Sequence, residues 1–298
     1  MSPDPRPIGI FDSGIGGLTV LRAVAARLPG ESLLYLGDTA RVPYGAKSPA
    51  TVSRYARECS SFLCERGIKA LVVACNTASA LAMDDLRAAL APAGIPALGV
   101  IEPGAVEACR VSRHGRVGVI GTASTIRSDA YARAIGVIRP DFTVISEACP
   151  LFVPLAEEGW TGDDDPVTRA VAERYLERFA RERVDTLILG CTHYPLLRGV
   201  IEKVLPGIVL VDSGAAVAGD LVRTLSRLGI EGSPDAGGRG ISSLHAQYHV
   251  TDDPERFRSV GARFLGHAID GPHLADLASP APTRTPQAAE DRRMEEAR

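Results

Sequence analysis

Residues 8–17 read IGIFDSGIGG, a short apolar run that ends at Asp12 and passes directly into a glycine-rich turn. The run is too short for a helix and is typical of a buried strand. Similar runs follow at residues 32–36, 70–74, 96–100, 116–120, 142–145, 186–189 and 209–211. Helix-length segments lie between them, and those that begin at Ser48 and Asp165 open with a capping residue followed by proline. This alternation predicts an α/β fold, with parallel sheets covered by helices on both faces.

The chain also repeats itself weakly. Residues 8–13, IGIFDS, resemble residues 117–122, VGVIGT, and residues 72–77, VVACNT, resemble residues 188–193, ILGCTH. The order of the two patterns is kept, which predicts two related, pseudo-symmetric α/β halves. Ligands of open α/β sheets bind beyond the carboxyl ends of the strands. We therefore expect Cys75 and Cys191, each at such an end, to present two thiols to one cleft between the halves.

Composition excludes several classes of protein. The 298 residues are 45% hydrophobic with a formal net charge of −3, so the basic excess typical of nucleic-acid-binding proteins is absent. No apolar stretch approaches the roughly 20 residues of a membrane-spanning helix, and no signal-peptide core is present. Six cysteines without a CxxC pair indicate free thiols rather than a disulfide scaffold. We expect a cytoplasmic protein with no nucleic-acid or membrane partner.

The cysteines fall into two groups. A buried cysteine is usually an ordinary core residue, and that interpretation suits Cys59 and Cys109. Cys75 and Cys191 differ, because each ends a strand and is followed by hydrogen-bonding residues suited to a helix start. A thiol at a helix N-terminus is expected to have a lowered pKa. Two opposed thiols could take a proton from one face of a carbon and deliver another to the opposite face, which is racemisation without a cofactor.

Other uses of these thiols stay open at this point. A metal site lacks any short ligand spacing, and a reducing compartment argues against a disulfide. A cysteine hydrolase or lyase would use one thiol and leave the other idle. A two-domain solute-binding protein would use neither.

The turn after the first strand is not a dinucleotide-binding motif. The third glycine of GxGxxG is Thr19 here, and Asp12 would repel a pyrophosphate. A carboxylate at this strand end better suits a substrate ammonium group or an orienting role beside Cys75. The alternative is that Asp12 caps a helix.

Seven motifs together resemble a known family. They are FDSGIGGLTV (11–20), GDTARVPYG (37–45), ACNTAS (74–79), IEPG (101–104), GTAST (121–125), FVPL (152–155) and GCTHYPLL (190–197). In this order they are similar to the glutamate racemases of the cofactor-independent aspartate/glutamate racemase superfamily, over about residues 8–212.

The resemblance implies conversion between L- and D-glutamate, which supplies D-glutamate for peptidoglycan, with no cofactor or metal. It implies that Cys75 acts on the D-enantiomer and Cys191 on the L-enantiomer, with Asp12 and His193 assisting the neighbouring thiols. Asp38 and Glu157 would be supporting carboxylates. A racemase for aspartate or another amino acid is the nearest alternative, and family members are often homodimers.

None of the substrate contacts that the resemblance implies is an arginine. The substrate carboxylates would be held by hydroxyls, amides and backbone N–H groups. The residues are Asp12, Ser13, Tyr44, Gly45, Asn76, Thr77, Thr122, Thr125, Thr192 and His193. Tyr44 and Gly45 could instead form a simple turn, and Thr122 and Thr125 could be helix caps.

The family fold has two α/β domains with the cleft between them. The resemblance implies a first domain of residues 1–98 plus 212–270 and a second of residues 99–211. Residues 232–243, rich in glycine, serine and proline, predict a surface loop. Residues 271–298 contain four prolines and end in a charged stretch, which predicts a disordered tail.

Overall fold

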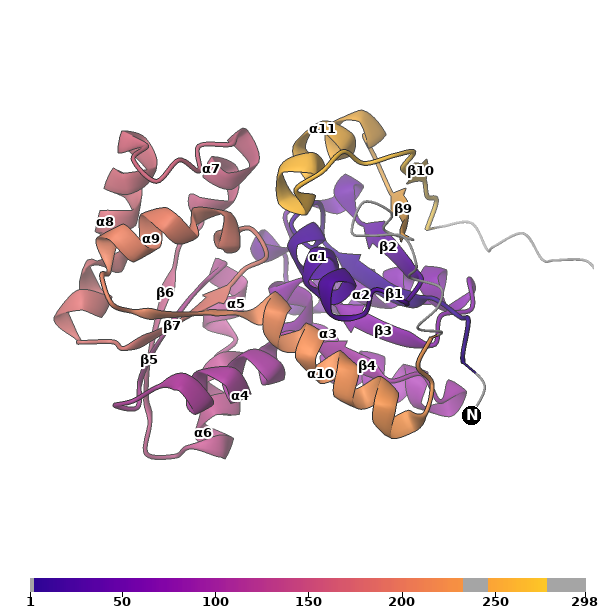
Figure 1. Ribbon diagram of the computed structural model, residues 1–298, viewed down its shortest axis with the longest axis horizontal. Coiled ribbons are helices and arrows are strands. Elements are labelled where there is room, and N and C mark those ends of the chain that lie inside the picture. Colours follow the sequence, from indigo (N-terminus) through magenta and orange to yellow (C-terminus); the bar gives the residue numbers. More distant parts are fainter. Residues whose placement is uncertain (1–2, 233–245, 278–298) are drawn as a thin grey trace, which may run out of the picture.

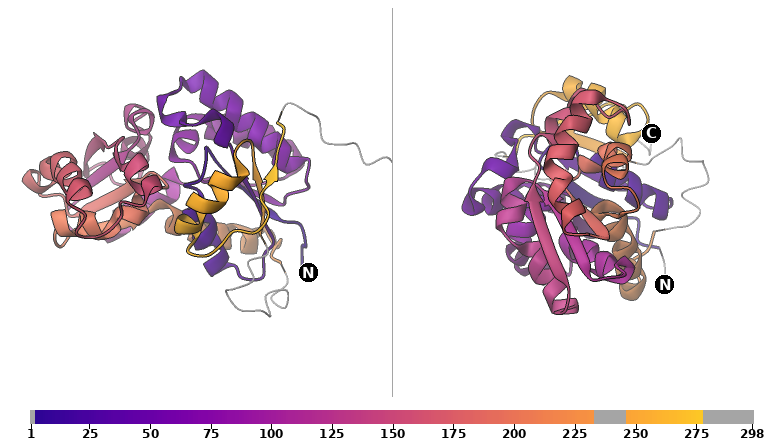
Figure 2. Two further views of the ribbon diagram at one scale, coloured as in Figure 1. Left: turned by 90° about the horizontal axis from the view of Figure 1, so that it is seen from above. Right: turned by 90° about the vertical axis from the view of Figure 1, so that its left-hand side faces the viewer.

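The computed structural model describes residues 3–232 and 246–277, and these form two parallel sheets that lie side by side (Figures 1 and 2). The first sheet has the strand order β10-β9-β2-β1-β3-β4 and the second has the order β6-β5-β7-β8. The first contains β1 (Ile8–Asp12), β2 (Leu33–Gly37), β3 (Ala70–Val73), β4 (Ala97–Gly99), β9 (Ala246–Val250) and β10 (His273–Leu274). The second contains β5 (Arg116–Gly121), β6 (Thr143–Ala148), β7 (Thr186–Gly190) and β8 (Val209–Asp212). Every predicted strand is confirmed, and so is the α/β fold.

The internal repeat is present in the topology. Within each half the first strand lies between the second and the third, and the fourth strand lies outside the third. β1 therefore corresponds to β5, and β3 corresponds to β7. The two sequence patterns of the repeat fall on these equivalent strands, so that β3 leads into Cys75 and β7 leads into Cys191.

Helices cover both faces of each sheet, because the strands are apolar on both sides. On the first sheet, α1, α10 and α11 cover one face and α2 and α3 the other. On the second sheet, α4 and α6 cover one face and α7, α8 and α9 the other. Their bounds are α1 (Leu18–Arg27), α2 (Pro49–Cys64), α3 (Asn76–Leu90), α4 (Ile101–Val111), α6 (Ala130–Ile138), α7 (Phe152–Glu158), α8 (Pro166–Arg181), α9 (Arg198–Val204), α10 (Ser213–Leu228) and α11 (Pro254–Leu265). The short helix α5 (Ala123–Arg127) follows β5.

Helix α10 returns the chain from the second half to the first, as Figure 1 shows. It begins directly after β8, where the Asp212 carboxylate accepts a hydrogen bond from the Gly214 N–H at 2.8 Å. Its apolar face, which includes Leu221 and Leu225, then packs in the same core as α1. This path supports the predicted domain boundary near residue 212. The boundaries at 98/99 and 211/212 stay a proposal.

The first residues of the predicted tail are ordered, contrary to the prediction. Residues 271–277 were expected to be disordered, but His273–Leu274 form β10, which pairs in parallel with β9. The Ala275 N–H donates to the Val250 carbonyl at 2.7 Å, and Ala275 is buried. Backbone pairing at the sheet edge therefore orders a segment that has little apolar pattern of its own. The rest of the expected tail, and residues 233–243 of the expected loop, lie outside the described residues.

Within the described ranges, no helix combines the length and apolar character that crossing a bilayer requires.

Candidate active site

A cavity of about 530 Å³ lies where the carboxyl ends of the strands in the two halves face each other. Its walls come from turns after β1, β3, β5 and β7, together with the residues after β2 and helix α7. It is lined by residues 13–15, 42–46, 75–77, 122–123, 127, 191–193 and parts of 150–157. Most of the residues that the sequence predicted for the site line this one cavity. Asp12, Asp38 and Thr125 do not appear in its wall.

Both predicted thiols line the cavity. Cys75 follows β3 and is the N-cap of α3, and its sulfur accepts from the Ala78 N–H at 3.5 Å and donates to Ser13 Oγ at 3.5 Å. Cys191 follows β7, and its sulfur lies 3.8 Å from His193 Nδ1. Both thiols are almost fully buried, with 6% and 7% exposure. The equivalent strands of the two halves thus bring one thiol each to a shared space.

The pKa of Cys75 differs from the expectation. Burial, and then the charge of Asp12, raise the pKa of this thiol to about 12. The hydrogen bonds with Ser13 and with the Ala78 N–H at the helix N-terminus lower it, but they are the weaker effect. The predicted lowering of the pKa is therefore wrong for Cys75, because the thiol is removed from water as well as placed at a helix end.

His193 connects Cys191 to a carboxylate. Its Nε2 lies 3.0 Å from Glu157 Oε1, and Arg256 Nη2 donates to Glu157 Oε2 at 2.9 Å. Burial opposes protonation of His193, but hydrogen bonds and negative charge from Cys191 and Glu157 outweigh it and raise the His193 pKa to about 10. The hydrogen bond from His193 in turn is the main cause that lowers the Glu157 pKa. The arrangement favours an imidazolium beside the Cys191 sulfur.

Asp12 is buried at the end of β1, with 1% exposure. Its Oδ2 accepts from the Gly14 N–H at 2.9 Å, whereas its Oδ1 has no hydrogen-bond partner among the described residues. Burial raises its pKa. The N-cap of α1 is Gly17, so Asp12 does not cap that helix. A buried carboxylate oxygen without a partner is costly, which makes it suited to a cationic ligand group.

The glycine-rich turn after Asp12 touches the opposite half. A Cβ on Gly16 would come within 2.3 Å of Thr192 Oγ1 and 2.4 Å of His193 Nδ1. Thr19 Oγ1 donates to the Thr192 carbonyl at 3.0 Å. The absence of a side chain at Gly16 therefore lets the turn of the first half pack directly against the Cys191 motif.

Asp38 lies behind the cavity wall and does not contact a thiol of the cavity. It accepts from the guanidinium of Arg41 at 2.7 Å, from the Tyr44 hydroxyl and from Thr251 Oγ1 at 3.0 Å. Tyr44 and Gly45, in the 3₁₀ turn Tyr44–Ala46, do line the cavity. Asp38 therefore holds Tyr44 in place, and its side chain caps no helix.

Three hydroxyls meet at the N-terminus of α5. Thr77 Oγ1 lies 2.9 Å from Thr122 Oγ1 and 3.3 Å from Thr125 Oγ1, and the latter two are 3.0 Å apart. Thr122 is the N-cap of α5, which confirms the alternative prediction that this residue caps a helix. It also lines the cavity. Nearby, Asn76 Oδ1 accepts from the Tyr131 hydroxyl at 2.7 Å, while Asn76 Nδ2 has no partner among the described residues. These groups can donate hydrogen bonds to an anion.

Arg127 lines the cavity but was not among the residues that the sequence predicts for the site. This residue ends α5 and lines the cavity, although the expected substrate contacts contained no arginine. A signal was present in the sequence, since Arg127 lies five residues after Thr122. Without the length of α5, however, nothing in the sequence places it at the cavity rather than on the surface.

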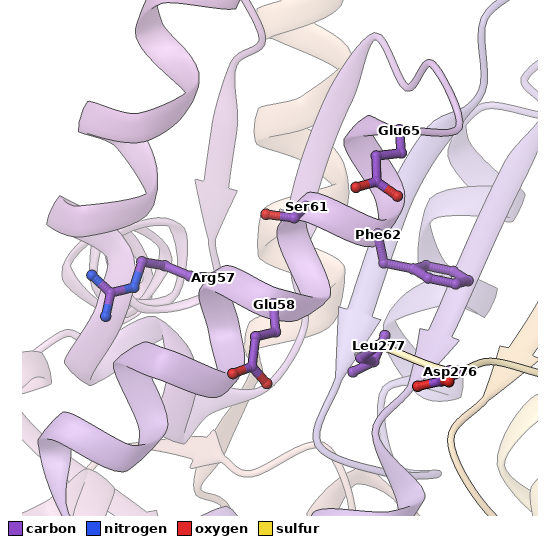
Figure 3. Close-up of a pocket in the computed structure, with 7 residues that line it drawn as sticks. All are labelled: Arg57, Glu58, Ser61, Phe62, Glu65, Asp276 and Leu277. Carbon is purple, nitrogen blue, oxygen red and sulfur yellow. The ribbon is translucent and has the colours of Figure 1, made fainter. Parts of the chain in front are cut away.

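A second, smaller cavity of about 290 Å³ lies between α2 and the residues after β10 (Figure 3). Phe62 and Leu277 contribute apolar surface, and Glu58 of α2 lies at the same cavity. It contains no thiol and none of the residues predicted for the site. No cluster of metal-ligating side chains occurs within residues 3–232 and 246–277.

Comparison with known proteins identifies relatives with the same architecture. Residues 18–221 match the model of the Asp/Glu/Hydantoin racemase family. A glutamate racemase from Geobacter metallireducens is 52% identical over 282 residues, which cover 91% of this chain and 97% of that protein.

Solved structures agree with this comparison. The glutamate racemase of Francisella tularensis, in complex with D-glutamate, is 38% identical with a TM-score of 0.83, covering 93% of this chain and 100% of the other. The Thermus thermophilus glutamate racemase, in complex with β-chloro-D-alanine, is 47% identical with a TM-score of 0.80, covering 93% and 99%. Because the family model covers more than half of the chain and a curated relative is 52% identical over 91% of it, this chain belongs to the Asp/Glu/Hydantoin racemase family.

Proposed function

We propose that the protein interconverts L- and D-glutamate by a two-base mechanism in which Cys75 and Cys191 are the acid and the base. The observation that carries this proposal is that two thiols from equivalent strands, β3 and β7, line one cavity. Racemisation needs one proton to leave one face of the α-carbon and another to reach the opposite face, and a single thiol cannot do both efficiently. The similarity to glutamate racemases supplies the substrate.

A two-base mechanism requires the two thiols to start the reaction in different protonation states. With a pKa raised to about 12, Cys75 is a neutral thiol at physiological pH. Cys191 lies 3.8 Å from His193 Nδ1, and the raised pKa of His193 places a cationic imidazolium beside this sulfur. In the L-to-D direction the Cys191 thiolate removes the α-proton and the Cys75 thiol donates its proton to the other face. The product state, with thiol at Cys191 and thiolate at Cys75, is the starting state for the D-enantiomer.

Neighbouring groups lower the barrier by holding the substrate and its charges. We assign the substrate ammonium group to Asp12 and Ser13, because Asp12 Oδ1 is buried and no described residue forms a hydrogen bond with it. An ammonium held there makes the α-proton more acidic and offsets the charge that raises the Cys75 pKa. The α-carboxylate is assigned to Asn76, Thr77 and Thr122, with Thr192 on the opposite side.

The remaining predicted residues act through others. Glu157 orients His193, Asp38 positions Tyr44 beside Gly45, and Thr125 hydrogen-bonds to the Thr77 and Thr122 hydroxyls. We further propose that the D-glutamate serves peptidoglycan synthesis in the cytoplasm and that the active form is a homodimer. These proposals rest on the family alone.

Deuterium exchange tests the chemistry. In D₂O, either enantiomer of glutamate should gain deuterium at the α-carbon as it racemises, which proton NMR and circular dichroism follow together. Cys75→Ser and Cys191→Ser should each lose racemisation, while Cys64→Ser, on α2 outside the cavity, should retain it. Full activity in the double serine variant would overturn the mechanism. Loss of activity in only one single variant would instead indicate a one-thiol hydrolase or lyase, and a panel of amino acids distinguishes glutamate from aspartate.

A further inference from the structure

A buried tyrosine of the second half forms a hydrogen bond with an amide of the first half. Tyr131 belongs to α6, and its hydroxyl donates to Asn76 Oδ1 at 2.7 Å. Asn76 is the first residue of α3 and directly follows Cys75, so this bond ends beside one of the two thiols. Tyr131 and Asn76 are each only 2% exposed. The proposed mechanism uses Asn76 to bind the α-carboxylate, but it gives Tyr131 no role.

Two glycines leave the space in which the Tyr131 ring lies. A Cβ on Gly104 of α4 would lie 3.2 Å from Tyr131 Cε1, and a Cβ on Gly190 of β7 would lie 3.1 Å from Tyr131 Cε2. The ring is therefore confined between a helix and the strand that leads into Cys191. Because close packing restricts the ring to one position, its hydroxyl meets the first half at a defined place.

The Tyr131 hydroxyl is a neutral donor. Burial raises its pKa, and a hydrogen bond with Ser213 offsets that increase only in part. The phenol therefore keeps its proton throughout the neutral pH range and can donate it to Asn76 Oδ1. This donation holds the carbonyl side of the Asn76 amide toward Tyr131.

The amino side of the same amide is available to a ligand. Asn76 lines the cavity, and no described residue accepts a hydrogen bond from its Nδ2, although this atom is buried. A buried amino group without an acceptor is costly, because it has given up its hydrogen bonds with water. An anionic ligand would supply the acceptor. With the amide turned over, the carbonyl oxygen would take the place of the amino group and would repel the anion.

We propose that Tyr131 is a positioning residue, which holds the Asn76 amide with its N–H groups directed at the α-carboxylate of the substrate. The inference rests on the proposed function for the substrate and for the part of it that Asn76 binds. Tyr131 itself is not part of the cavity wall. Because Tyr131 comes from the second half and Asn76 from the first, the carboxylate site is complete only when the two halves are in contact.

The experiment removes the hydroxyl and keeps the ring. Tyr131→Phe should raise the KM for both enantiomers of glutamate roughly tenfold. It should change kcat by less than about twofold, because the hydrogen bond to the α-carboxylate is present in the ground state and the transition state alike. The matched control is Tyr175→Phe on α8, which removes a hydroxyl that accepts from the Leu151 N–H. This control should keep the KM and the kcat of the wild type.

A double-mutant cycle distinguishes positioning from a merely structural role. In an Asn76→Ala background no amide is left to orient, so Tyr131→Phe should raise the KM there by less than about twofold. Equal effects in the two backgrounds, or an unchanged KM in Tyr131→Phe, would overturn the inference. If Tyr131→Phe does not fold, Gly104→Ala takes its place, because the added Cβ displaces the ring and leaves the hydroxyl present. Its effect on the KM should depend on Asn76 in the same way.

Binding without turnover gives the second readout. Calorimetry with D-glutamate, on full-length protein that carries Cys75→Ser and Cys191→Ser, should show the same roughly tenfold loss of affinity and the same dependence on Asn76. If the wild type racemises no glutamate but this coupling is found, the proposed function fails and the role of Tyr131 stands. If glutamate is racemised and the coupling is absent, the proposed function stands and the inference fails. A protein that does not bind D-glutamate would overturn both.

Discussion

The imidazole of His193 lies between Glu157 and Cys191. Its Nε2 is 3.0 Å from Glu157 Oε1, and its Nδ1 is 3.8 Å from the Cys191 sulfur. Glu157 and His193 come from α7 and from the turn after β7, two elements that the sequence separates by a long helix. The pair gives Cys191 a cationic neighbour, whereas the hydrogen-bond partners of Cys75 among the described residues are Ser13 and the Ala78 N–H. The two thiols are therefore chemically unequal although their strands are equivalent.

Glu157→Gln should lower activity and shift its pH dependence. The His193 pKa is raised to about 10, so the imidazolium is present below that pH and is lost above it. Without the carboxylate, the His193 pKa falls toward its usual value near 6.5. We expect the alkaline limb of kcat/KM for L-glutamate to move to lower pH and kcat to fall roughly 10²-fold. Glu158→Gln, one residue further and exposed, is the control, and identical pH profiles for the two variants would contradict the assignment.

Asp38→Asn should impair binding more than chemistry. Asp38 contacts Tyr44, Arg41 and Thr251 but no thiol of the cavity, so its loss frees Tyr44 at the cavity wall. The KM for glutamate should rise roughly tenfold with a smaller change in kcat. Steady-state kinetics in both directions measure the split, and Tyr44→Phe should reproduce the effect. A loss of kcat at unchanged KM would instead make Asp38 part of the proton-transfer chemistry.

A buried ion pair at the opposite end of the first sheet should control stability. Lys69 Nζ lies 2.6 Å from Glu31 Oε2, with side-chain exposures of 0% and 4%, and it also donates to the Asp4 carbonyl. Glu31→Gln leaves the buried ammonium without its counter-charge and should cost about 3–5 kcal/mol in the free energy of unfolding. Urea denaturation measures this.

The double variant Lys69→Met/Glu31→Leu provides the control for that pair, because no buried charge is left without its partner. It should recover much of the lost stability. Racemisation at low temperature should change little in either variant, since the pair lies at the amino ends of the strands. A Glu31→Gln protein as stable as the wild type would show that water or another group compensates Lys69.

The sequence predicts the architecture well, because the architecture depends on local patterns of apolar residues. Short apolar runs define the strands, and the repeat of IGIFDS and VVACNT identifies which strand ends are equivalent. The sequence predicts poorly the features of the site that depend on tertiary packing. The raised Cys75 pKa follows from burial, the contact of Asp38 with Tyr44 from the path of the turn, and the position of Arg127 from the length of α5. The sequence does not predict β10, because its two residues have weak strand propensity and are ordered by pairing with β9 at the sheet edge.

Asp12→Asn should separate turnover from thiol reactivity. Asp12 is the charge that most raises the Cys75 pKa after burial itself, so its removal should lower that pKa and increase the thiolate fraction at Cys75. Alkylation of Cys75 in the free protein at pH 8–9, followed by mass spectrometry of the labelled peptide, should therefore become faster. Racemisation should nevertheless fall by roughly 10²-fold or more, because the ammonium group loses its carboxylate. Asp220→Asn on the exposed side of α10 controls for general loss of charge, and slower alkylation in Asp12→Asn would show that Asp12 does not act on Cys75 through its charge.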